Sequence, residues 1–153
     1  MKACAIITQH IIALFIKQKR DYQIVEFLQY QQLSQNAAQL TEGGKFDQAE
    51  AIYRQLLESD ISDRDKSIIC YNLTILSEKA GRKYDILKWY DEGIRFEERH
   101  CQYFVTEKKA IYLANIGETR DSLSVLKQLY QQPYLTEGDK SRIQQNIDIL
   151  SKC

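Results

Sequence analysis

Three glycines divide the chain into units of nearly equal length. Gly44, Gly81 and Gly117 lie 37 and 36 residues apart, and each opens a similar stretch: GKFDQAEAIYRQLL, GRKYDILKWYDEGI and GETRDSLSVLKQLY. A short turn between two helices needs a left-handed residue, and glycine adopts that conformation without a Cβ clash. The spacing therefore predicts a helix–turn–helix hairpin that occurs three times. Because one hairpin cannot cover its own apolar face, we expect successive hairpins to stack around a continuous core.

Apolar residues recur at helical spacing along most of the chain. The stripes predict helices over residues 24–40, 46–57, 69–80, 84–96, 101–116, 119–131 and 136–152. No long run alternates with period two, and only 6 glycines and 1 proline are present, which argues against a turn-rich β fold. The sequence predicts an all-α fold, and we assign residues 21–153 to one helical repeat domain because no linker interrupts them.

The N-terminal segment, residues 1–20, has a composition of its own. Residues 3–16 read ACAIITQHIIALFI and are followed by a short basic cluster. The run is shorter than the roughly 20 residues that span a bilayer as a helix. We expect a buried helix or strand that caps the domain or contacts a second copy in a homodimer. An interfacial anchor, a weak secretion signal and the continuation of an upstream domain are the alternatives that the sequence leaves open.

The hairpins resemble the tetratricopeptide repeat family between about residues 23 and 132. The matching positions hold small, apolar, aromatic or turn residues: Ala37, Leu40, Gly44, Ala49 and Tyr53 in the first unit, Leu73, Gly81, Tyr90 and Gly93 in the second, and Ala110, Leu113, Gly117, Ser122 and Leu126 in the third. The units are longer than the family's 34 residues and lack its early tryptophan. The resemblance implies a right-handed αα-solenoid, a superhelix of about three hairpins with N- and C-terminal capping helices. It also implies a concave groove, lined by the first helix of each hairpin, that binds peptides.

Three-to-four spacing along those first helices selects the groove residues. The candidates in the second and third units are Ile68, Tyr71, Asn72, Ile75, Lys79, Phe104, Lys108, Ile111 and Asn115. The first unit contributes Gln31, Ser34, Ala38 and Glu42. Apolar and aromatic side chains with neighbouring amides and lysines suit an amphipathic helix or an extended apolar peptide. The same apolar residues could instead belong to the core.

Catalytic and metal-binding patterns are missing from the sequence. His100 adjoins Cys101, but consecutive helical residues point about 100° apart, and no third orienting group is indicated. No set of closely spaced metal ligands and no phosphate-binding glycine motif occurs. Glu97, Glu98 and Asp60 are interpreted as solvated charges at helix ends. We therefore expect no enzyme activity, no cofactor and no metal.

The net charge limits the classes of partner, and the cysteine content indicates the compartment. The 21 basic and 21 acidic residues give a formal net charge of zero, so the chain as a whole has no electrostatic attraction to nucleic acid. The four cysteines are too widely spaced for a Cys-x-x-Cys pair, which fits reduced thiols and a cytoplasmic protein. The leading hypothesis is a non-enzymatic scaffold that binds a protein or peptide partner. The alternatives are a peptide- or ligand-sensing regulatory domain and a membrane-associated assembly factor that uses the N-terminal segment.

Overall fold

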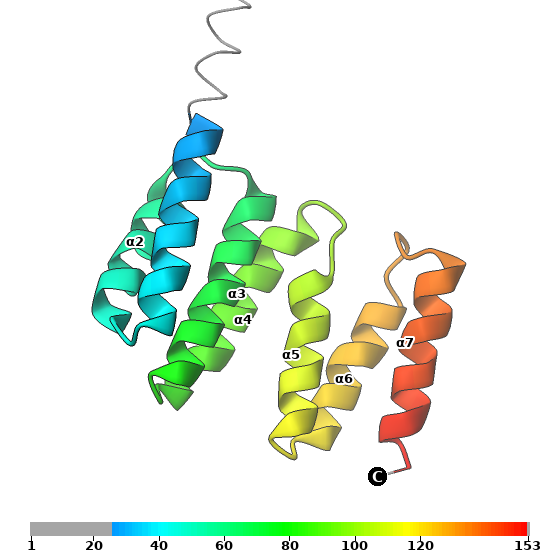
Figure 1. Ribbon diagram of the computed structural model, residues 1–153. Helices are drawn as coiled ribbons and strands as arrows, with labels where there is room; N and C mark the ends of the chain where they lie inside the picture. Colours follow the sequence, from blue (N-terminus) through cyan, green and yellow to red (C-terminus); the bar gives the residue numbers. More distant parts are fainter. Residues whose placement is uncertain (1–25, 153) are drawn as a thin grey trace, which may run out of the picture.

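The computed structural model describes residues 26–152, and this part of the chain is all-helical. Residues 26–42 are helical, and this first described helix is called the first helix below. It is followed by α2 (Phe46–Glu58), α3 (Asp63–Lys79), α4 (Lys83–Glu98), α5 (Phe104–Asn115), α6 (Thr119–Tyr130) and α7 (Glu137–Leu150) (Figure 1). Each predicted stripe coincides with one of these helices, so the all-α prediction is confirmed. The predictions for residues 1–20 lie outside the described residues.

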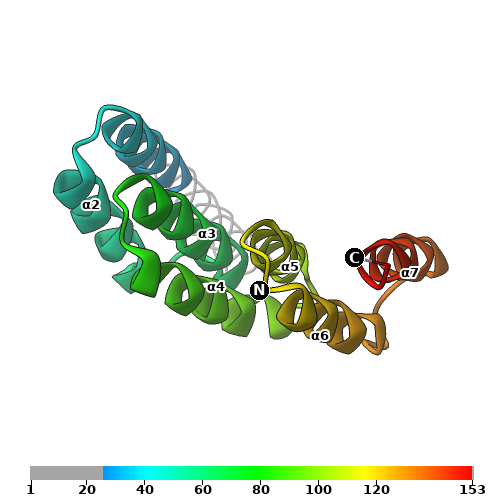
Figure 2. The same ribbon diagram turned by 90° about the horizontal axis from the view of Figure 1, so that it is seen from below.

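The helices form two layers between which the chain alternates. The helix of residues 26–42 lies beside α3, α5 and α7 in one layer, and α2, α4 and α6 form the other (Figure 2). Each helix packs mainly on its neighbours in the sequence. The row of helices bends, with α3, α5 and α7 on the inner side of the curve (Figure 2). None of the described helices is long and apolar enough to cross a membrane.

The predicted glycine turns share one conformation. Gly81 has a φ of +70°, and Gly44 and Gly117 have values of +74° and +85°. In the turn at Gly81, the N–H of Arg82 donates to the Ser77 carbonyl at 2.8 Å and that of Gly81 donates to the Glu78 carbonyl at 3.1 Å. The other two turns repeat both bonds. This is the Schellman pattern, which satisfies the last carbonyls of a helix and requires a left-handed residue.

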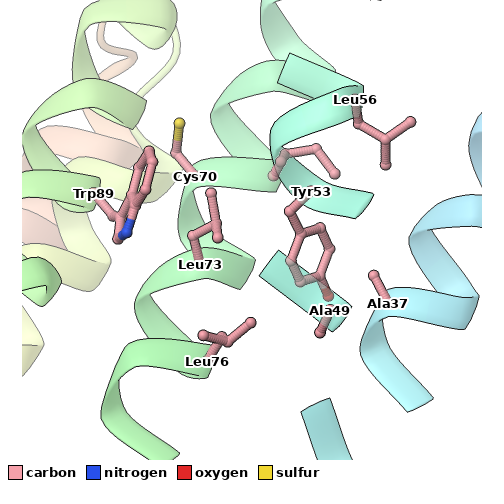
Figure 3. Close-up of a cluster of buried hydrophobic side chains, with 9 residues drawn as sticks. Ala37, Ala49, Tyr53, Leu56, Cys70, Leu73, Leu76 and Trp89 are labelled. Atoms are coloured by element: carbon pink, nitrogen blue, oxygen red, sulfur yellow. The ribbon is translucent and has the colours of Figure 1, made fainter. Parts of the chain in front are cut away.

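The largest apolar core lies where α2, α3 and α4 meet the first helix. Ala37 and Ala49 have no exposed surface, which lets the first helix and α2 approach closely, and Tyr53 fills the space beside them (Figure 3). Leu73 on α3 and Trp89 on α4 extend the same cluster. The remaining buried members are Leu56, Ile69, Cys70 and Leu76. Two smaller clusters follow along the row, one around Val105 and one around Ile143.

The helices α3 and α7 begin at capping residues that the sequence contains, whereas α5 begins later than its apolar stripe predicts. Ser62 caps α3 by accepting from the Asp65 N–H, and Thr136 forms a capping box with Asp139 at α7. By contrast, α5 begins at Phe104 and not at residue 101, because Cys101 adopts a left-handed φ of 54°.

The prediction that Glu97 is a solvated charge is wrong. Its side chain is 1% exposed, and its carboxylate accepts from the backbone N–H groups of Val105 and Thr106 at 2.6 and 3.1 Å and from the Thr106 hydroxyl. The carboxylate thus satisfies two of the N–H groups that the first turn of α5 leaves without a helical partner. Burial nevertheless raises the pKa of Glu97 above its usual value.

Candidate functional site

The nine predicted groove residues lie on two helices of the same layer. Those from Ile68 to Lys79 lie on α3 and those from Phe104 to Asn115 on α5, and every one of them retains solvent exposure. Phe104 and Ile111, at 42% and 53% exposure, are among the exposed large apolar side chains of the described residues.

Aromatic rings connect α3, α4 and α5. Tyr71 and Phe104 meet edge to face, with ring centroids 5.2 Å apart and planes at 83°. Tyr71 is also 6.4 Å from Tyr90, and Tyr90 is 5.6 Å from Tyr112. Such offset and edge-to-face pairs stabilise a contact beyond the area they bury. The rings therefore hold one side of the inner face in a fixed shape.

Lys108 extends over this aromatic cluster. Its Nζ lies 5.3 Å from the Phe104 ring centroid and 6.0 Å from that of Tyr71, which is within range of a cation–π interaction. Lys108 forms no ion pair with any carboxylate of the described residues. Aromatic rings compensate the charge of an ammonium group less than a carboxylate does. The positive charge of Lys108 therefore remains available to a ligand on this face.

A groove of about 490 Å³ separates α5 from α7. Small side chains of α5, Ala110 and Ala114, line it together with Leu126 of α6. The exposed side chains of Ile111 and Ile149, which is 62% exposed, form its rims. The other lining residues are Phe104, Glu107, Lys108, Asn115, Ser122, Arg142, Asn146 and Leu150. We name this feature the α5–α7 groove.

Polar bonds close one end of the α5–α7 groove. Arg142 of α7 forms an ion pair with Glu107 of α5, and the Tyr103 hydroxyl donates to Asp139 at 2.5 Å. Hydrogen bonds from Thr136 and Tyr103 lower the pKa of Asp139 to about 2. These bonds fix the start of α7 beside the start of α5.

A second hollow adjoins this closed end. Its volume is about 440 Å³, and it shares Phe104, Glu107 and Arg142 with the α5–α7 groove. Ile68 and Arg64 of α3 line it, as do the buried Glu97 and residues 101–103. The two hollows thus adjoin each other on either side of the Glu107–Arg142 ion pair, and we call them together the depression on the inner face.

Only part of the predicted site lines this depression. Ile68, Phe104, Lys108, Ile111 and Asn115 do so, and Tyr71 supports Phe104 from behind. Asn72, Ile75 and Lys79 line neither hollow, and Lys79 forms an ion pair with Glu42 at 3.0 Å.

Sequence reasoning missed the contribution of α7. Arg142, Asn146 and Ile149 line the α5–α7 groove, although the last helix was interpreted as a cap. A signal was present, because Ile149 lies off the stripe formed by Ile143, Ile147 and Leu150. An apolar residue on the polar side of a terminal helix indicates a second apolar contact.

Potential metal-ligating and nucleophilic side chains are scattered over the described residues. No group of three or more His, Cys, Asp and Glu side chains within 26–152 could hold a metal ion. His100 lies 3.4 Å from Asp63 but is exposed, as is Cys101. Burial raises the pKa of the Cys70 thiol to about 12, so this cysteine stays protonated and unreactive at neutral pH.

The inner face thus combines an apolar groove, fixed aromatic rings and an available cation. No protein-family model, curated protein or solved structure matches this chain.

Proposed function

We propose that the chain is an αα-solenoid of the tetratricopeptide type that binds a peptide or an amphipathic helix in the α5–α7 groove. It acts as a scaffold and not as an enzyme. The observation that carries this proposal is the apolar groove of about 490 Å³, which is bordered by two exposed isoleucines. Exposed apolar surface of this kind marks interaction sites in proteins that are otherwise well packed.

Contacts between successive hairpins support the solenoid part of the proposal. Side-chain bonds join residues about one hairpin apart: Glu42 to Lys79, Tyr103 to Asp139, and Glu107 to Arg142, with separations of 37, 36 and 35 residues. In a stacked repeat, equivalent positions of neighbouring units face each other, so bonds recur at the repeat length. The three identical glycine turns agree with the same arrangement.

The shape of the groove supports a helix or a short extended segment as the ligand. The α5 helix, Phe104–Asn115, has 12 residues, so the groove beside it is about 18 Å long. About three turns of a helix fit that length, and they would place side chains at i, i+3, i+4 and i+7 against the two isoleucine rims. Asn115 and Asn146 each offer a donor and an acceptor for polar atoms of the ligand.

Selection from a random peptide library displayed on phage tests this function. Peptides enriched on the full chain are synthesised, and their affinities are measured by fluorescence anisotropy for the wild type, for Phe104→Glu and for Tyr84→Glu. Tyr84 is fully exposed on α4, and α4 belongs to the layer opposite that of α5 and α7. We expect Phe104→Glu to weaken binding at least roughly tenfold, because it introduces a charge into an apolar contact.

The matched variant decides the outcome. If Tyr84→Glu weakens binding as much as Phe104→Glu, or if neither does, the peptides bind elsewhere and the proposal is wrong. Circular dichroism of both variants establishes that their helices are intact.

A small-molecule sensor is the second candidate function. The groove volume falls within the range of roughly 300–1,000 Å³ that is typical of small-molecule sites. Native mass spectrometry of the purified chain distinguishes the two candidates. A bound molecule of a few hundred daltons that is lost in the Ile111→Glu variant favours the sensor, and a bare chain together with selected peptides favours the scaffold.

A further inference from the structure

The charges around the depression on the inner face are uneven. Its walls carry three cations, Arg64, Lys108 and Arg142, and two carboxylates, Glu97 and Glu107. Both carboxylates already interact with other groups of the protein. Glu107 forms an ion pair with Arg142, and Glu97 is buried and accepts three hydrogen bonds from Val105 and Thr106.

The remaining cations have no such partner. Neither Arg64 nor Lys108 forms an ion pair with a carboxylate of residues 26–152. They lie on different helices, and Phe104 borders the hollow of Arg64 while its ring contacts Lys108. Elsewhere Lys79 and Lys109 form ion pairs, whereas Lys83 and Lys127 form none within the described residues. What distinguishes Arg64 and Lys108 is their position in the walls of the two hollows.

We infer that the partner segment is acidic: an amphipathic peptide of another protein, with carboxylates beside the apolar residues that enter the α5–α7 groove. This inference rests on the proposed function and specifies its ligand. Lys108 precedes Ile111 by three residues, which is about one helical turn along α5. A carboxylate that reaches Lys108 therefore lies about one turn from the side chain that contacts Ile111, and a second carboxylate at the Phe104 end meets Arg64.

The same charges argue against the chain's own apolar N-terminal run as the occupant. Residues 3–16 are followed closely by Lys17, Lys19 and Arg20. A segment that brings three cations to a face with two uncompensated cations would meet repulsion where an acidic segment meets attraction. Charge complementarity thus selects between two apolar ligands that the groove alone would accept equally well.

The test uses the displayed random peptide library with the full chain and two charge variants. One variant is the pair Arg64→Glu, Lys108→Glu. The other is Lys83→Glu, an exposed residue of α4 that serves as the matched control. We expect the peptides enriched on the wild type and on Lys83→Glu to contain more Asp and Glu than the unselected library, next to large apolar residues.

The affinity of one enriched peptide for each variant measures how much the two cations contribute to binding. Reversal of both charges is expected to weaken binding roughly tenfold or more, since each exposed pair contributes up to about a factor of five and reversal adds repulsion. Raising NaCl from 0.05 to 0.5 M should weaken wild-type binding and leave the double variant nearly unchanged.

The possible results separate this inference from the function on which it rests. Enriched peptides that are neutral or basic, and that still lose affinity in Phe104→Glu, would overturn the acidic ligand and leave the peptide scaffold intact. Enrichment of no peptide at all would overturn both. Acidic peptides that bind Arg64→Glu, Lys108→Glu as tightly as the wild type would overturn the assignment of these two cations.

Discussion

The two ends of the helical row close their interfaces in different ways. Between the first helix and α4, buried side chains of very different size, from Ala37 to Trp89, form the largest apolar core. Between α5 and α7, the small side chains of Ala110 and Ala114 line the α5–α7 groove. The same hairpin plan thus produces a packed core where large residues face small ones, and a binding surface where small residues lack a large partner.

Ile69 and Ile111 make this comparison directly, because they are the same residue type on two helices of one layer. Ile69 is fully buried on α3, and Ile111 is 53% exposed on α5. We expect Ile69→Ala to lower the free energy of unfolding by roughly 3–4 kcal/mol through lost burial and a residual cavity. Ile111→Ala should lower it by less than about 1 kcal/mol. Urea denaturation of both variants measures the difference, and equal losses would mean that the groove is closed in solution.

Substitution of Glu97 should have the next largest effect on the free energy of unfolding, because this residue of α4 caps the start of α5 and so connects the core to the groove. Glu97→Ala removes the acceptor for two backbone N–H groups at the start of α5, which should cost about 2–3 kcal/mol of unfolding free energy. The neighbouring Glu98→Ala, an exposed change, should alter it by less than about 0.5 kcal/mol. A similar loss in both variants would contradict the capping role.

The pH dependence of this site has a definite sign. Because burial raises the folded-state pKa of Glu97, its contribution is fully present below the usual carboxyl value of 4.5 and decreases as the pH rises through the folded pKa. Glu97→Gln does not titrate, so the wild type should lose stability relative to this variant as the pH rises above 4.5. Parallel pH profiles of the wild type and Glu97→Gln would show that the pKa is unshifted.

Gly93 tests how tightly α3, α4 and α5 pack against one another. A Cβ placed on Gly93 would lie 3.0 Å from Val105 and 3.1 Å from Cys70, closer than ordinary contacts. We expect Gly93→Ala to cost about 1–2 kcal/mol of unfolding free energy through overpacking. The matched change Gly138→Ala on α7 meets nothing closer than 3.8 Å and should be neutral or slightly stabilising. Calorimetry of both variants makes the comparison, and a neutral Gly93→Ala would mean that this interface can relax.

How far the sequence predicts this molecule depends on the range of the interaction. Turns and stripes depend on residues that are near in the chain. The turns at Gly44, Gly81 and Gly117 and the helices within residues 26–152 could therefore be predicted. Glu97 could not, because its partners follow a left-handed residue, Cys101, that no local pattern marks.

The candidate site divides in the same manner. Spacing along α3 and α5 identified Phe104, Lys108 and Ile111, because side-chain direction on one helix follows from its period. The sequence did not reveal the contribution of Arg142 and Ile149, since the distance between α5 and α7 depends on packing across helices that are not consecutive. The missing part of the site is therefore the part that requires knowing how two hairpins stack.

The smallest effect concerns how firmly α7 is held beside the groove. Asp139 accepts from the Thr136 hydroxyl and backbone and from Tyr103, and its pKa is lowered to about 2. Its stabilising contribution is therefore present above the usual carboxyl value of 3.8 and is lost as the pH falls towards about 2. Asp139→Asn should remove this dependence, so amide hydrogen exchange in α7 should be faster than in the wild type at pH 5 and should approach the wild-type level near pH 2.

Asp148 lies on the same helix, near its opposite end, and provides the control. Because a carboxylate near a helix C-terminus is unfavourable to the helix dipole, Asp148→Asn should not accelerate exchange. If exchange accelerates in α7 alone, the groove has one firmly held wall and one that opens readily, and ligand entry can follow local opening of α7. If Asp139→Asn accelerates exchange equally in α3 and α4, the row unfolds as one cooperative unit, and the difference between its two ends is one of shape and not of stability.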